Sequence, residues 1–322
     1  PYGDDLEIPP LAELKQLYIR VPIAAEELDI AVLPSLTRLS VNVLYPEKTA
    51  PWLPNLSKMT ALESLTYCSL TLPEMIKMSR NLPPQISEVN LFALRLNNPK
   101  GQGQFWRNMM KCTQLTSLNI PDIEELPPAF FLKWMKTSSM STVNFQTYHE
   151  DDPVEPLACT LPAMKCLRSL QLTTDMKPME PHLKKCTQLT ELDVAIDEED
   201  IPVIVSVLEN MRELEKLVVL CSMSEMPAPF YALHFPYLTS IDITVAGSDL
   251  HLLADFLERH PKLTKLSVTF TSDVHDMDQS WKVLLSCPEL VNIKRHDETD
   301  LEYVSCVLTS LPPTLRELYW DV

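Results

Sequence analysis

The chain has 322 residues, 45% of them hydrophobic, which is enough apolar material for a sizeable buried core. A formal net charge of −17 disfavours nucleic acid as a ligand, because such a charge repels a phosphate backbone, but it permits a basic protein partner. The apolar residues fall in short runs, so we predict no membrane span, which would need roughly 20 consecutive apolar residues.

Residues 1–10 are predicted to form a short N-terminal lead, with an acidic stretch at Gly3–Glu7. A predicted strand over Leu14 to Ile19 follows almost at once. This strand is the first of a series of repeats that runs along the chain. The end of such a series normally needs a polar cap, because an uncovered end exposes core leucines and unpaired backbone groups. We therefore expect either that this lead folds over the first strand or that the natural protein extends further upstream.

The strand at Leu14 is the first copy of a spacing that returns along the chain: leucine, two variable residues, leucine, one variable residue, apolar residue. Its clearest copies are Lys111–Ile120 (KCTQLTSLNI) and Lys185–Val194 (KCTQLTELDV). The spacing places three side chains on one side of a short extended segment. The thirteen copies begin at Leu14, Leu36, Leu62, Ile86, Leu115, Met140, Leu167, Leu189, Leu214, Leu238, Leu263, Leu290 and Leu315.

The mean interval is about 25 residues, and over about Leu11 to Val322 the chain resembles a leucine-rich-repeat protein. The likeness is to the cysteine-containing, ribonuclease-inhibitor-like repeats of F-box leucine-rich proteins. The resemblance implies an α/β solenoid of about 13 repeats, formed as a single domain over 1–322. A parallel sheet would line the concave face of a horseshoe, with helices or extended segments on its convex side.

The return segments between the predicted strands change along the chain. In the first third they are short and proline-rich, as at Val43–Pro46 and Pro51–Pro54, which favours extended or turn-like crossings. Later, apolar residues at three- and four-residue spacing predict helices, with capping patterns at Asp276–Gln279 and Thr299–Glu302. The predicted helices cover residues 129–135, 201–211, 250–259, 281–286 and 301–308.

Two stretches interrupt the regular spacing. Residues 97–103 hold two of the four glycines and are predicted to form a protruding flexible loop. Residues 148–156 form an acidic, proline-bearing insertion immediately after a predicted strand. Inserted loops of repeat proteins often lie at the binding face, although an ordinary solvated excursion explains this one equally well. The chain ends inside its last predicted strand, Leu315 to Val322, which favours either further chain downstream or edge-to-edge association.

Eight cysteines occur singly, without the CxxC pairs typical of metal sites and of the caps of secreted repeat proteins. Cys112, Cys186 and Cys287 each lie three residues before a template leucine, which is where the resemblance to F-box leucine-rich proteins places cysteines. We interpret them as small apolar groups buried in a tight turn, which favours a reducing compartment. One glycosylation acceptor, at Asn55, is present, but a single sequon is close to accidental.

Enzyme chemistry has little support. Four glycines in the whole chain exclude a Walker loop or a dinucleotide fingerprint, and neither GxSxG nor HExxH occurs. A metal site at His149 with its acidic neighbours is disfavoured, because adjacent residues on a loop rarely converge on one ion. His234 and His260 are interpreted as turn residues. We therefore predict a protein that is not an enzyme, with no catalytic residue, cofactor or metal.

A surface remains, made of the strand residues that alternate with the template leucines and face solvent on the concave sheet. Serine and threonine dominate it, and they suit an exposed strand whatever the function. Aromatic and basic side chains are better candidates for contact, because such side chains dominate interface energetics. The predicted protein-contact residues are Tyr18, Arg20, Arg38, Phe92, Tyr148, Arg168, Lys265, Lys294 and Tyr319.

The leading prediction is a cytoplasmic protein-recognition scaffold, similar to the substrate-binding half of F-box leucine-rich proteins and part of a larger assembly. No F-box helices precede Leu11, so an adaptor role would need an upstream segment. Two alternatives stay open. One is a secreted or cell-surface receptor ectodomain. The other is a pathogen effector, because Leu82-Pro83-Pro84 and Leu311-Pro312-Pro313 resemble the phrases of bacterial ubiquitin-ligase effectors.

Overall fold

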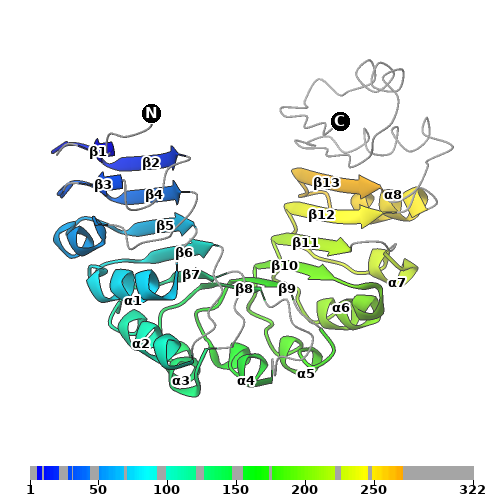
Figure 1. Ribbon diagram of the computed structural model, residues 1–322. Helices are drawn as coiled ribbons and strands as arrows, with labels where there is room; N and C mark the ends of the chain where they lie inside the picture. The colour runs from blue at the N-terminus through cyan, green and yellow to red at the C-terminus, as the bar shows by residue number, and fades with distance from the viewer. Residues whose placement is uncertain are drawn as a thin grey trace, which may run out of the picture. The chain divides into compact units, whose positions relative to one another are not determined.

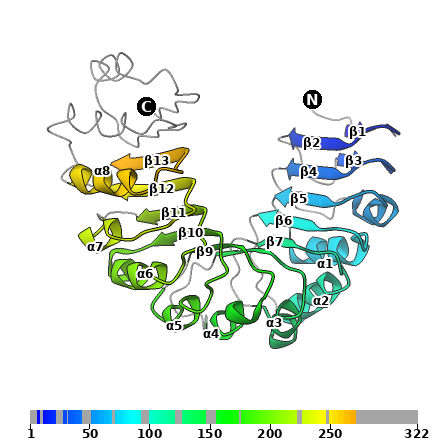
Figure 2. The same ribbon diagram turned by 180° about the vertical axis from the view of Figure 1, so that it is seen from behind.

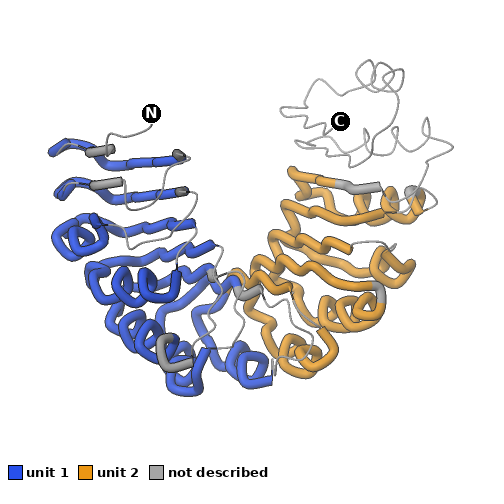
Figure 3. The backbone as a smooth tube through the Cα atoms, in the orientation of Figure 1, with its two compact units in different colours: residues 1–167 blue, residues 168–322 orange. Residues whose placement is uncertain are grey.

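The structure of the chain is a computed structural model that divides into two compact units, residues 1–167 and 168–322 (Figure 3). The predicted single domain over 1–322 stays a prediction. The structure describes residues 6–8, 11–21, 28–30, 32–43, 51–68, 71–92, 99–120, 127–146, 155–173, 176–221, 226–245 and 249–270.

Parallel strands form the framework of both units (Figure 1). In the first unit the strands, in spatial order, are β2 (Gln16–Val21), β4 (Arg38–Val43), β5 (Ser64–Cys68), β6 (Glu88–Phe92), β7 (Ser117–Ile120) and β8 (Thr142–Gln146). In the second they are β9 (Ser169–Thr173), β10 (Glu191–Ile196), β11 (Lys216–Cys221), β12 (Ser240–Val245) and β13 (Lys265–Phe270).

Each of these strands begins two residues after a template start, so the repeat set the positions correctly. The turn before the strand explains the offset. The backbone N–H of Leu36 donates to the carbonyl of Leu33 at 3.2 Å, and that of Leu189 donates to the carbonyl of Cys186 at 3.2 Å. The predicted strand at Leu315 lies outside the described residues.

The second leucine of the template forms a buried column in each unit. In the first unit Leu39, Leu65 and Leu118 are at most 1% exposed, and in the second Leu192 and Leu266 are 1% exposed. Register pairs such as Val89 with Leu118 and Ile241 with Leu266 keep each column aligned. Burying one such side chain contributes about 1.5–3 kcal/mol, so neighbouring repeats stabilise each other by stacking.

A small second sheet belongs to the first unit. In it β1 (Leu6–Ile8) pairs in parallel with β3 (Leu28–Ile30). The crossing between β2 and β4 therefore contains an extended segment, β3. Of the two crossings named above, Pro51–Pro54 leads into a 3₁₀ turn at Leu53–Lys58, and residues 44–46 lie outside the described residues. Residues 6–8 of the predicted lead form the strand β1, while residues 1–5, 9 and 10 lie outside the described residues.

Helices lie on one side of the strands in each unit, and two opposite views agree on this (Figures 1 and 2). The opposite side of the strands is called the open face below. The helices are α1 (Leu72–Asn81), α2 (Pro99–Met109), α3 (Ala129–Met135), α4 (Glu155–Ala158), α5 (Glu180–Leu183), α6 (Ile201–Leu208), α7 (Ala228–Tyr231) and α8 (Leu250–Glu258). Short 3₁₀ turns accompany them at η2 (Leu53–Lys58), η3 (Leu161–Ala163) and η4 (Glu198–Asp200).

The helices predicted at 129–135, 201–211 and 250–259 are confirmed as α3, α6 and α8. Those predicted at 281–286 and 301–308, with their capping patterns, lie outside the described residues.

The pattern of apolar residues did not reveal α1, although its capping signal is present. The carboxylate of Glu74 accepts both the backbone N–H of Thr71, at 2.9 Å, and its hydroxyl, at 3.0 Å. These bonds are the Glu74 half of a capping box, in which the residue at N3 accepts the backbone N–H of the residue that caps the helix.

The loop predicted at 97–103 is wrong over 99–103, where α2 begins. Proline suits the first turn of a helix because its fixed φ matches and its missing N–H has no partner there. Further along, Phe105, Trp106 and Met109 are fully buried, so packing outweighs the glycines' low helix propensity. The Trp106 ring lies 4.3 Å from that of Phe131 on α3, which ties successive return segments together. In the insertion predicted at 148–156, Glu155 and Pro156 begin α4.

Candidate protein-binding face

Strand register places the open-face residues in rows. In the first unit one row contains Tyr18, Ser40, Thr66, Asn90 and Asn119. Burial alternates along β5 and β6, so the residues between the core positions are the ones left accessible. This row carries no charged side chain, and the Asn90 amide donates to Glu88 Oε1 at 2.8 Å.

Many of the serines and threonines predicted on this face have a structural role. The hydroxyl of Thr37 donates to the carbonyl of Lys15 at 2.9 Å, and Thr116 does the same to Ser87 at 3.1 Å. In the second unit Thr239 donates to Glu215 at 3.0 Å. We call this series the hydroxyl ladder, and its members are Thr37, Ser87, Thr116, Ser141, Thr190, Thr239 and Thr264. Each member binds the backbone of the preceding repeat, which accounts for its residue type without a partner.

Three of the predicted contact residues in the first unit are well exposed. Tyr18 is 66% exposed, and its hydroxyl donates to Gln16 Oε1 at 3.3 Å. Arg20 and Arg38 are exposed, and Phe92 is half-buried. Tyr18 lies in the row beside Ser40, while Arg38 is the register partner of Gln16. Their role in binding stays a prediction.

In the second unit Arg168 precedes β9 and Lys265 begins β13, and both are exposed. The Arg168 carbonyl accepts the backbone N–H groups of Thr190 and Glu191, so its backbone is held while its side chain faces out. The remaining predicted contact residues, Tyr148, Lys294 and Tyr319, lie outside the described residues.

Sequence reasoning missed the middle of the second unit's open face. Val218 and Leu220 on β11 alternate with buried Leu217 and Val219, and Leu220 is 42% exposed. The repeat copy at Leu214 already implies these positions. Contact residues were predicted from aromatic or basic character, a criterion that an apolar pair does not meet.

Two carboxylates flank that apolar pair. Val218 is the register partner of Asp193 on one side and of Asp242 on the other. Burial raises the pKa of Asp193, Lys216 lowers it and the carboxylate of Asp242 raises it further. The second unit thus presents partly desolvated negative charge where the first presents neutral amides.

The cysteines before the template leucines fill a general core position. Cys112 and Cys186 are free and buried, and burial raises their thiol pKa values to about 11 and about 12. Met59, Met211 and His260 occupy the same place in other repeats and are also buried. The position therefore selects for a group that fits the turn, as expected for a structural cysteine. Cys287 lies outside the described residues.

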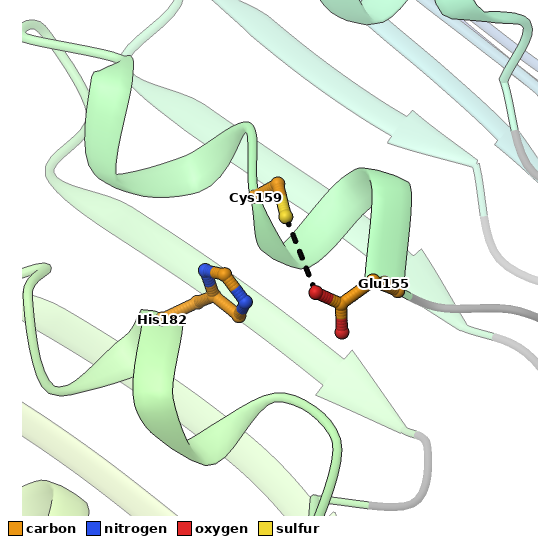
Figure 4. A group of neighbouring side chains, drawn as sticks. All are labelled: Glu155, Cys159 and His182. Atoms are coloured by element: carbon orange, nitrogen blue, oxygen red, sulfur yellow. Dashed lines mark hydrogen bonds between the residues drawn. The ribbon is translucent and has the colours of Figure 1, made fainter.

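One exposed cysteine differs from these. The Cys159 thiol, just after α4, donates to Glu155 Oε1 at 3.4 Å (Figure 4). Figure 4 also draws His182, which belongs to α5 of the second unit. Cys166 is exposed as well. Exposure makes both thiols accessible, in contrast to the buried pair above.

His260 is more than a turn residue. Its Nε2 accepts the backbone N–H of Phe235 at 2.9 Å, and its Nδ1 lies 2.6 Å from the carbonyl of Phe256. This arrangement requires a neutral ring with the proton on Nδ1. Burial lowers the pKa of His260, opposed by the Phe256 hydrogen bond and reinforced by His234 and Arg259.

The glycosylation acceptor also has a structural partner. The Asn55 side-chain nitrogen, to which a glycan would attach, donates to the carbonyl of Ile30 at 2.8 Å. None of the helices within the described ranges is long and apolar enough to cross a membrane.

No protein-family model matches the chain, and no curated protein sequence matches it. Solved structures do match. The chain is similar to one in a crystal structure of the Rad7 and Elc1 complex in yeast, at 16% identity and a TM-score of 0.65, covering 95% of this chain and 81% of that one.

Two further matches have lower scores. An internalin of Listeria monocytogenes matches at 17% identity and a TM-score of 0.40, over 85% of this chain and 72% of that one. A leucine-rich-repeat protein of Leptospira interrogans matches at 11% identity and a TM-score of 0.37, over 92% and 84%.

Proposed function

We propose that this leucine-rich-repeat protein is a non-catalytic recognition scaffold that binds a protein partner on its open face and serves as the substrate-receptor module of a larger assembly. The observation that carries the proposal is the contrast between the two faces of the strands. Helices cover one face in each unit. On the other, Tyr18 and Leu220 expose 66% and 42% of their surface.

Energetics supports a binding role for such positions. Side chains such as tyrosine and arginine contribute most when a partner excludes water from them. Tyr18, Arg20 and Arg38 lie on two adjacent strands, so one partner could cover all three. The surrounding hydroxyl ladder is already bonded to the backbone, which leaves a firm platform around these exposed groups.

The proposal also makes the more specific claim that the protein is one module of a larger assembly. Its support is the likeness of the chain, at a TM-score of 0.65, to a chain solved in the complex of Rad7 and Elc1. Elongated repeat arrays suit this role because they offer one broad surface while another part of the chain docks elsewhere.

Affinity capture with the full chain tests the proposal. One variant removes exposed groups from the open face of the first unit, with Tyr18→Ser, Arg20→Ser and Arg38→Ser. A matched control replaces three exposed groups on the helical side, with Lys133→Ser on α3, Glu209→Ser just after α6 and Glu258→Ser on α8. We expect proteins that the wild type and the control retain to be lost from the open-face variant. Recovery of the same set from all three would refute binding through this part of the face.

We also propose a cytoplasmic location. The six cysteines in the described ranges are free, and the Asn55 nitrogen is bonded to Ile30. The test uses protein isolated from its natural source. It is unfolded in denaturant, its thiols are alkylated with and without prior reduction, and its intact mass gives the number of labels. Equal numbers of labels are expected. Extra labels after reduction, or a glycan at Asn55, would favour the receptor ectodomain.

A further inference from the structure

The second unit contains an apolar contact point set between two carboxylates. Asp193, Val218 and Asp242 are consecutive register partners on β10, β11 and β12. Neighbouring strands lie about 4.8 Å apart, which places the two aspartates about 10 Å apart with Val218 between them. Two residues further along β11, Leu220 is 42% exposed beside its register partner Ala195. We call Ala195, Val218 and Leu220, with these two aspartates, the acid-flanked patch.

The electrostatics of the patch is unbalanced. Burial and the neighbouring carboxylate of Asp242 both raise the pKa of Asp193. Lys216 lowers that pKa, yet it forms no ion pair with either aspartate. Within the described ranges neither aspartate accepts a hydrogen bond. Burial and the repulsion from Asp242, only partly offset by Lys216, disfavour the charged form of Asp193, and a cation placed between the two carboxylates would relieve this.

We infer that the acid-flanked patch is the central contact of the open face and that it binds a partner segment carrying a basic side chain next to a large apolar one. This inference rests on the proposed function and names the partner's chemistry. The basic group would lie between Asp193 and Asp242, and the apolar side chain would cover Leu220 and Val218. Arginine fits best, because its planar fork can donate to two carboxylates at once.

Charge complementarity distinguishes this occupant from others. The whole chain carries a net charge of −17, so a basic segment is attracted from a distance before it docks. A second copy of the chain would be repelled by the same charge. An apolar segment without a cation would desolvate both carboxylates and leave them unpaired, which is costly.

The experiment selects peptides from a phage-displayed library of random 12-residue sequences on the full-length chain. We expect the selected peptides to place arginine or lysine within two positions of a large apolar residue. The strongest peptide is then synthesised, with a second version in which citrulline replaces the basic residue. Citrulline keeps the shape of arginine and lacks its charge, so we expect at least a tenfold loss of affinity by fluorescence anisotropy.

Protein variants locate the contact. Asp193→Asn and Asp242→Asn each keep the side-chain volume and remove one charge. Each should lower the affinity for the peptide about tenfold or more. Leu220→Ser should lower the affinity for both the basic peptide and its citrulline version, because the apolar contact is lost in either case. Asp255→Asn, an exposed aspartate on α8, is the matched control and should leave binding unchanged. Unchanged melting temperatures show that the variants are folded.

The outcomes separate this inference from the function it rests on. Peptides without basic residues, or peptides insensitive to both aspartate variants, overturn the inference. If peptide binding is instead lost in Tyr18→Ser or Arg38→Ser, the inference is overturned, while the proposed recognition scaffold is supported. If no peptide binds in a manner sensitive to any open-face variant, the inference is overturned and the proposed function loses support with it.

Discussion

The two units have interiors of the same kind and differ in the face that they present. The near copies at Lys111–Ile120 and Lys185–Val194 show this in the sequence itself, because their template leucines are identical. At the alternating positions, Ser117 is matched by Glu191 and Asn119 by Asp193. Packing therefore constrains every second residue of a strand. The residues between are free to change, and that is where the two units acquire different chemistry.

The first test asks whether the interiors are as equivalent as they look. Leu118→Ala and Leu192→Ala remove the same buried group from one unit each, both at most 1% exposed. Each should lower the unfolding free energy by about 3–5 kcal/mol, through lost burial and the cavity left behind. Urea unfolding followed by circular dichroism measures both. A cost below about 1 kcal/mol for either would show that the two columns are not packed alike.

The second test uses His260, a buried histidine of the second unit that has no counterpart among the described residues of the first unit. The four histidines in the described ranges all belong to the second unit, and among them His260 bonds two successive return segments. His260→Leu leaves the Phe235 N–H without an acceptor and should cost about 1–3 kcal/mol at pH 7.5.

The pH dependence of His260 has a definite sign. Its pKa is lower in the folded protein than in the unfolded chain, so the unfolded chain binds the proton more tightly. Its contribution is fully present above the unfolded pKa of about 6.5 and is lost as pH falls through the folded value. Wild type should therefore lose stability on acidification relative to His260→Leu. An equal pH dependence of unfolding for the two proteins would contradict the assignment.

A third change should raise stability, in the first unit. The Tyr67 hydroxyl is buried and has no hydrogen-bond partner among the described residues, and the centroid of its ring lies 5.5 Å from that of Trp52 in a stacked arrangement. Burial, with Glu74 and Cys68 nearby, raises the pKa of Tyr67. Tyr67→Phe keeps the ring and removes the unpaired group, so we expect a gain of about 1 kcal/mol in urea unfolding. Tyr237→Phe, at a side chain 46% exposed in the second unit, is the control and should change little. A loss of stability in Tyr67→Phe would mean that the hydroxyl has a partner.

Much of the fold was predictable because leucine spacing reports directly on burial. The template gives the start of each of the 11 strands β2 and β4 to β13, although not of β1 and β3. The return segments were harder, since their local signals conflict. In α2 two glycines and a proline favour a loop, and burial of Phe105, Trp106 and Met109 decides for a helix.

The candidate face could be only half predicted. Alternation shows which residues point outward, and so Tyr18, Arg20 and Arg38 were found in advance. It does not show which of the outward side chains already form hydrogen bonds within the protein. The hydroxyl ladder became visible only with the backbone carbonyl of the preceding repeat in place. Likewise, Asp193 and Asp242 are 49 positions apart in sequence, and only strand register brings them to either side of Val218.

The smallest expected effect concerns that ladder, which both units share beneath their different faces. Thr116→Val in the first unit and Thr239→Val in the second each keep a β-branched side chain and remove one hydroxyl bonded to a backbone carbonyl, at 3.1 Å and 3.0 Å. Each should cost about 0.5–1 kcal/mol, because a net hydrogen bond is worth about that much. Thr142→Val, on β8 and outside the ladder, is the control. If both ladder variants prove as neutral as the control, serine and threonine recur there for strand propensity alone. Equal costs in the two units would instead show that the ladder fastens successive repeats whatever the face above it displays.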